Sequence, residues 1–119
     1  MLKSKKDYAD NESLDINEAS DYLPDLGHLV ELAKGGSPAF LTEFSKRYPE
    51  VLNKLLTKAP TLIGKELELC AYLHLQFATK EVAYCTNCTV RSIENRKYRV
   101  RKKLGLSGKV DLVAWIISL

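Results

Sequence analysis

Basic side chains crowd one short stretch of the sequence, and their chemistry is the binding of polyanions. Seven lysines and arginines lie between Arg91 and Lys103, against the single acid Glu94. Residues 61–119 hold 10 basic and 5 acidic side chains (+5), and residues 1–60 hold 8 and 10 (−2), which together give the net +3 of the chain. Such a surface attracts nucleic acid, or it is a solvated helix face. Charge alone leaves these interpretations about even.

The apolar spacing in the same stretch predicts how the charges are presented. A long helix is expected from residue 90 to residue 104, with Thr89 as its N-cap and Gly105 as its end. One stripe of this helix is apolar, at spacings of seven and four, and consists of Ile93, Val100 and Leu104. The stripe must pack inward, so the basic residues project outward.

A shorter helix is expected just before the basic one. It runs from Thr79, its predicted N-cap, to about Tyr84, and Ala83 is the small residue at which two helices can cross. Residues 85–88, Cys-Thr-Asn-Cys, form the link. A short bracing helix, a tight turn and a long basic helix make up a helix-turn-helix, whose second helix enters the DNA major groove.

Geometry then assigns roles to the outward side chains. Glu94, Asn95 and Tyr98 lie on successive turns and are predicted to contact bases: Asn pairs with adenine, Glu accepts from cytosine, and Tyr meets a thymine methyl or a phosphate. The predicted phosphate contacts, which position the helix without reading sequence, are Thr79, Lys80, Arg91, Ser92, Arg96, Lys97, Arg99, Arg101 and Lys102.

The rest of the chain is also expected to be helical, which makes the fold class all-α. Residues 1–12 are predicted to be a flexible tail, and residues 13–60 a helical lead-in that serves dimerisation or regulation. Within it, a helix from Pro24 to Ala33 stops at two glycines, a second begins at Ser37-Pro38, and Pro49 begins a third. Residues 61–119 form the helix-turn-helix domain. No membrane span, signal peptide or disulfide framework is visible, so a cytoplasmic location is expected.

A family resemblance covers nearly all of residues 61–119. Five runs follow in order: Leu62–Cys70, Thr79–Ala83, Thr89–Glu94, Arg101–Leu106 and Asp111–Val113. They resemble the LuxR/GerE pattern "LTxxExxVL", "xxKEIA", "SxxTVKxH", "KLG" and "xELV". The resemblance implies a four-helix, DNA-binding bacterial transcription regulator whose third helix reads DNA and whose fourth helps dimerisation. Glu94 and Arg96 depart from the family's usual lysine and histidine, so the DNA sequence that is read is expected to differ.

The resemblance extends into the lead-in. Residues 40–44, residues 48–52, Pro60 and the run from Ser92 to Leu104 are similar to a variant found at the C-termini of sensor-regulators, behind triple-tyrosine, β-propeller or tetratricopeptide modules. This implies that residues 36–60 are an integral part of the domain. A dimer is expected, with the apolar last helix as one interface and the N-terminal helices as the other candidate. The predicted residues are Val110, Leu112, Val113, Trp115 and Ile116.

Other functions remain as alternatives. The first alternative is a protein-interaction module, in which the helix-turn-helix fold binds another protein and not DNA. RNA polymerase is a further candidate partner. A thiol or zinc sensor is the weaker alternative, drawn from Cys85 and Cys88 with Cys70 and His74 one helical turn apart. Buried apolar roles for these cysteines are favoured, so no metal or cofactor is expected. Neither histidine has a nucleophile arrangement around it, and no enzyme is expected.

Overall fold

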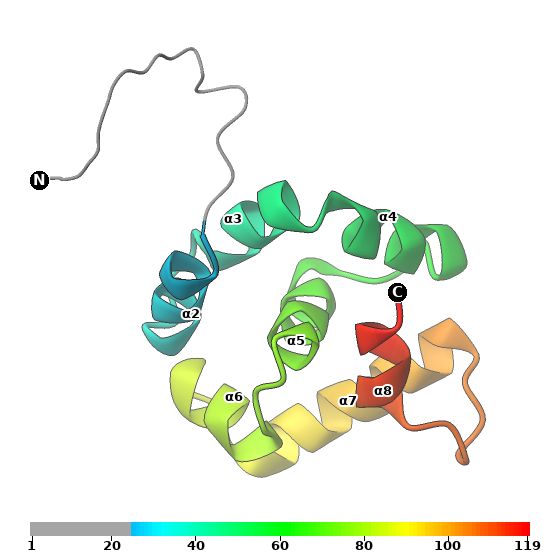
Figure 1. The fold of residues 1–119 in the computed structure, drawn as a ribbon. Coiled ribbons are helices and arrows are strands. Elements are labelled where there is room, and N and C mark those ends of the chain that lie inside the picture. Colours follow the sequence, from blue (N-terminus) through cyan, green and yellow to red (C-terminus); the bar gives the residue numbers. More distant parts are fainter. Residues whose placement is uncertain (1–24) are drawn as a thin grey trace, which may run out of the picture.

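Helices account for the regular structure of residues 25–119, the part of the chain that this computed structural model describes. No strand occurs in that range, which confirms the all-α class, and none of its helices is long and apolar enough to cross a bilayer. The seven helices (Figure 1) are α2 (Leu26–Lys34), α3 (Phe40–Arg47), α4 (Pro49–Lys58), α5 (Gly64–His74), α6 (Thr79–Cys85), α7 (Val90–Leu104) and α8 (Leu112–Ile117). The predicted tail at 1–12 and the lead-in residues 13–24 lie outside the described residues.

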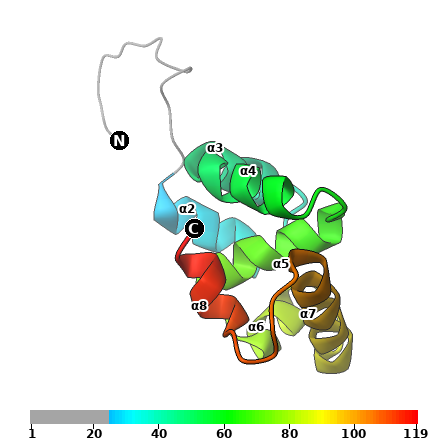
Figure 2. The same cartoon turned by 90° about the vertical axis from the view of Figure 1, so that its right-hand side faces the viewer.

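Helix α5 occupies the centre of the fold because it is apolar around its circumference. The five successive residues Leu69 to Leu73 are all buried, and five residues cover more than one turn of 3.6. Neighbours must therefore pack on every side of α5. Helix α3 contacts it from the lead-in, and α7 and α8 contact it from the other half of the chain. Figures 1 and 2 show α5 lying between the α3–α4 pair and the group α6 to α8.

Aromatic rings join the lead-in to α5. Phe40 on α3 packs against Tyr72 on α5, with 4.6 Å between ring centroids and the ring planes tilted by 47°. Phe44 lies 5.6 Å from His74, edge to face, and Tyr48 lies 4.9 Å from the same imidazole. Such ring pairs add about 0.5–1.5 kcal/mol each beyond the area that they bury. We call these five residues the aromatic cluster; they make the lead-in part of the same core.

Helix α2 is tied to the second half of the chain at two points. The buried Tyr72 hydroxyl donates a 2.8 Å hydrogen bond to the Ala33 carbonyl near the end of α2. Gly36 follows with a φ of +62°, and a Cβ there would collide with the backbone oxygen of Cys85 at the end of α6. Only glycine combines a left-handed φ with so close an approach. The turn after α2 thus rests directly on the helix that precedes the basic one.

Two helix starts differ from the sequence prediction. Ser37 and Pro38 form a turn in which the Ser37 hydroxyl accepts from the Ala39 amide at 3.1 Å, and α3 begins only at Phe40. Thr79 is the first residue of α6 and not its N-cap, which is Ala78. The reason is Glu81, whose carboxylate accepts from the Ala78 amide at 2.7 Å and so satisfies the helix start from inside.

Candidate nucleic-acid interface

A tight turn connects α6 to α7 and is fixed by local hydrogen bonds. The Cys88 amide donates to the Ala83 carbonyl at 2.9 Å, and the Thr86 hydroxyl donates to the Val82 carbonyl at 2.7 Å. Asn87 takes a φ of 56°, in the left-handed region that asparagine adopts more readily than most residues. The angle between the two helices is therefore built into the backbone.

Both predicted ends of α7 are confirmed. The Thr89 hydroxyl accepts from the Ser92 amide at 3.0 Å, as an N-cap does, and Gly105 closes the helix with a φ of 69°. Helix α7 packs most extensively on α6 and also on α5. The predicted apolar stripe faces this core, with Ile93 and Val100 at 0% exposure and Leu104 at 2%.

The three predicted base-contacting residues all lie on the exposed side of α7. Tyr98 is 61% exposed, and the Lys102 ammonium lies 5.6 Å from its ring centroid, a cation–π contact that holds the ring at the surface. Asn95 is exposed beside it. The Glu94 carboxylate lies 4.0 Å from the Lys97 ammonium one turn later. The outward face therefore carries amide, carboxylate and phenol groups within a cationic surround.

The predicted phosphate contacts fall into two groups. Four are exposed: Lys80, Arg91, Arg99 and Lys102. Five are half-buried: Thr79, Ser92, Arg96, Lys97 and Arg101. In the second group, the Thr79 hydroxyl accepts from Lys97 at 3.1 Å. The Arg101 guanidinium donates to the carbonyls of Ser107 at 2.9 Å and Val110 at 2.7 Å, so it holds the loop that follows α7.

Glu66 is a key residue that the sequence prediction missed. It lies on α5 at 1% exposure, the buried charged residue of the described core. One carboxylate oxygen accepts from the Lys103 ammonium at 2.8 Å and from the Ile63 amide at 3.0 Å. The other oxygen lies 3.7 Å from the Arg99 Nε. Lys103 also donates to the Thr61 carbonyl at 3.0 Å, so this ion network fixes the second half of α7 against α5.

The electrostatics around Glu66 keep it ionised. Burial by itself raises the pKa of the Glu66 carboxyl, but hydrogen bonds from Lys103 and Ile63 and the charges of Lys103 and Arg99 outweigh it, and the pKa lies below its ordinary value of 4.5. A buried carboxylate with such partners is strongly fixed in place. The sequence offered a local signal for the capping role alone, a glutamate three residues after Ile63, and none for the pairing with Arg99 and Lys103.

The structure does not bring the cysteines and histidine of the zinc hypothesis together. Within residues 25–119, no group of three or more His, Cys, Asp or Glu side chains is placed to hold a metal ion. Cys70 is fully buried, and burial, with a smaller contribution from the charge of Glu66, raises the pKa of its thiol to about 12. Burial also disfavours the charged form of His74, and it therefore lowers the pKa of this imidazole. The His74 Nδ1 has no hydrogen-bond partner among the described residues.

Fewer of the residues predicted for the dimer face on the last helix reach the surface than the sequence suggested. Leu112 and Ile116 are 3% and 0% exposed in the core of this chain, so their side chains do not reach the surface. Ile117 is 40% exposed instead. The half-buried members of the predicted set are Val110, Val113 and Trp115. Trp115 lines a groove of about 420 Å³ between α4 and α8, together with Asn53, Lys54, Thr57, Lys58 and Leu119.

Comparisons with known proteins leave the family open. No family model, no curated protein and no solved structure matches the chain. The LuxR/GerE resemblance therefore stays a prediction from the sequence.

Proposed function

We propose that the chain binds duplex DNA of a specific sequence through α7 and so regulates transcription, as a LuxR-type helix-turn-helix. One observation carries the proposal: a 15-residue helix, capped at both ends and braced by α6, buries three apolar residues and turns a cationic face outward. A major groove about 12 Å wide admits such a helix. Exposed amide, carboxylate and phenol groups on the same face supply the donors and acceptors that base edges need.

The proposal divides the face into two kinds of contact. Asn95, Glu94 and Tyr98 read bases, and the surrounding lysines and arginines neutralise phosphates. Loss of a base contact changes which sequence is preferred, by about 1–3 kcal/mol. Loss of a phosphate contact weakens binding to every sequence alike and reduces the slope of log K against log salt by about 1.

In vitro selection from a random duplex library, with the full 119-residue chain, tests the proposal. We expect one motif to be enriched. Asn95→Ala should then lose preference for that motif, Arg91→Ala should weaken all duplexes equally, and Lys46→Gln on the exposed side of α3 should change neither. No enrichment above the starting library would overturn the proposal. Equal affinity of Asn95→Ala and the parent for every duplex would overturn the assigned recognition face.

The form that binds is proposed to be a dimer on two half-sites about 34 Å apart, one turn of DNA. The dimer is supported by apolar side chains at the surface of α8. Ile117 is exposed, and Trp115 lines the groove between α4 and α8. Sedimentation of the chain with and without the selected duplex measures the stoichiometry. Two chains bound per palindromic site are expected, and one chain per site would contradict the dimer.

Protein interaction is the second candidate function, and the same groove favours it. Leu56 on α4 is 38% exposed close to this region in sequence, and an apolar groove of this size accepts side chains of a partner. The selection experiment separates the two candidates, because an interaction module would enrich no duplex.

A further inference from the structure

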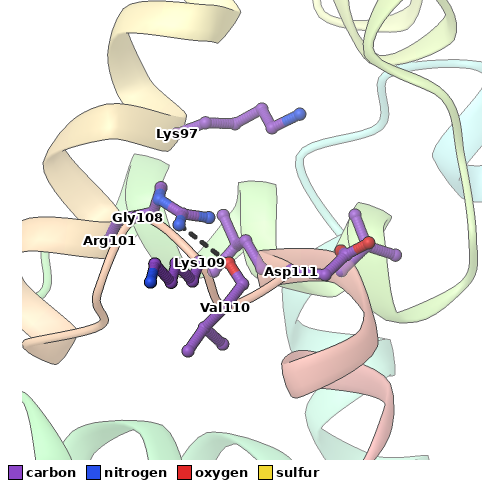
Figure 3. Close-up of a pocket in the computed structure, with 8 residues that line it drawn as sticks. Lys97, Arg101, Gly108, Lys109, Val110 and Asp111 are labelled. Carbon is purple, nitrogen blue, oxygen red and sulfur yellow. Dashed lines mark hydrogen bonds between the residues drawn. The ribbon is translucent and has the colours of Figure 1, made fainter.

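A second cationic feature lies beside the recognition face and involves residues outside α7. It is a pocket of about 440 Å³ between α7 and the loop that leads to α8 (Figure 3). Lys97 and Arg101 line it from α7, one turn apart, and Lys109 lines it from the loop. Asp111 is its acidic lining residue.

The pocket is held in shape by Arg101. Its Nη2 donates to two loop carbonyls, at 2.9 Å to Ser107 and 2.7 Å to Val110, and Figure 3 shows the bond to Val110. Both bonds use one nitrogen of a guanidinium that has five N–H donors. The loop is thereby fixed against α7, and Arg101 lines the pocket with donors that these two bonds do not use.

The charges in the pocket are unbalanced. The Asp111 carboxylate accepts from the Ala114 amide at 3.2 Å as the N-cap of α8. Lys97 is shared between Thr79 and Glu94. Lys109 is exposed, and its ammonium lies within ion-pair distance of no carboxylate among residues 25–119. Three cations against one carboxylate leave a net positive pocket that attracts an anion.

We infer that this pocket takes a phosphate of the DNA backbone, with Lys109 as a phosphate contact outside the recognition helix. The inference rests on the proposed function. Its geometric basis is the position of Lys97 and Arg101 on one flank of α7, between the buried stripe and the outward face. When a helix lies in the major groove, its flanks face the sugar-phosphate strands at the groove edges. The other flank of α7 carries Arg96 and the exposed Arg99. Lys109 on the loop therefore adds an exposed cation to the flank of Lys97 and Arg101, which are both half-buried.

Salt dependence of DNA binding tests the inference. Each phosphate that a cation neutralises contributes about 0.9 to the slope of log K against log salt. Lys109→Gln removes the charge and keeps a flexible polar side chain that is one atom shorter. Lys46→Gln, on the exposed side of α3, which lies across α5 from α7 (Figure 1), is the matched control. The full chain is titrated with its selected duplex and with a scrambled duplex of equal length, over a series of KCl concentrations.

The expected result is that Lys109→Gln lowers the slope by about 1 on both duplexes, with an unchanged preference between them, while Lys46→Gln matches the parent. Parental slopes for Lys109→Gln, in a chain that still binds its duplex, overturn the pocket inference and leave the proposed function standing. Failure of the parent itself to bind any duplex overturns both.

A free phosphorylated ligand has the same chemistry as a backbone phosphate, so a second titration separates the two sources. Inorganic phosphate is added to the parent and to Lys109→Gln without DNA, and the amide signals of residues 108–110 are followed by NMR. Weak, unsaturated shifts are expected. Saturation below 1 mM (roughly −4 kcal/mol) that Lys109→Gln abolishes, together with parental salt slopes, would assign the pocket to a small ligand and overturn the inference.

Discussion

The two sides of α5 are held by different forces. On the lead-in side, the aromatic cluster buries rings against one another. On the α7 side, an apolar stripe is supplemented by the ion network around Glu66. Ring burial depends little on salt and is not directional, whereas a buried carboxylate fixes orientation and responds to pH and salt. The helix that is proposed to read DNA is thus held against α5 by charge as well as by apolar contact.

The largest effect is expected from removing a ring on the lead-in side. Phe44→Ala should lower the free energy of unfolding by about 3–5 kcal/mol, because the side chain is fully buried between Phe40, Tyr48 and His74. Thr42→Ala on the exposed side of α3 should stay within about 0.5 kcal/mol of the parent. Urea unfolding measures both. If Phe44→Ala lowered the free energy of unfolding by less than Glu66→Gln, the variant on the α7 side of α5, the lead-in would not be an integral part of the core.

A smaller loss is expected on the α7 side. Glu66→Gln keeps an oxygen for the Ile63 amide but loses the charge that pairs with Lys103 and Arg99, and should cost about 2 kcal/mol at pH 7. Glu68→Gln, on the same helix, is the control and should cost little. Because the folded pKa of Glu66 is lowered, its contribution is complete above about 4.5 and fades as pH falls through the folded value. A cost for Glu66→Gln that persisted unchanged at pH 3 would contradict this assignment.

The smallest expected effect is a pH dependence of stability that comes from His74, on the lead-in side of α5. Burial lowers the pKa of His74, so its neutral form is favoured in the fold, and the stability it contributes is complete above its ordinary pKa of 6.5. Stability should therefore decline slightly as pH falls from 7 to 5, before Glu66 begins to titrate. His74→Phe keeps a ring in the aromatic cluster and should abolish this decline. Parallel pH profiles for the variant and the parent over that range would refute it.

The sequence predicted α7 well because its signals are local. Thr89, Gly105 and the apolar stripe act within one helix, and all three appear as expected. The start of α6 was wrong by one residue because Glu81, from inside the helix, replaced Thr79 as the capping group. Glu66 could not be placed in advance, because its partners are 33 and 37 residues further along the chain. Arg101 was expected to contact only DNA phosphates. Its hydrogen bonds to the Ser107 and Val110 carbonyls depend on the backbone path of the loop after α7, which residue spacing does not reveal.

The close approach of Gly36 to the Cys85 carbonyl bears on where this chain can be cut. A fragment that starts at Thr61 keeps α6, α7 and the family resemblance, yet it strips the Ala33 acceptor from the buried Tyr72 hydroxyl and uncovers one whole side of α5. A piece that starts at Asp25 retains these contacts and also the cap of α2, in which the Asp25 carboxylate accepts from the His28 amide at 2.8 Å. As a transferable module for grafting onto other proteins, α7 therefore comes with its lead-in.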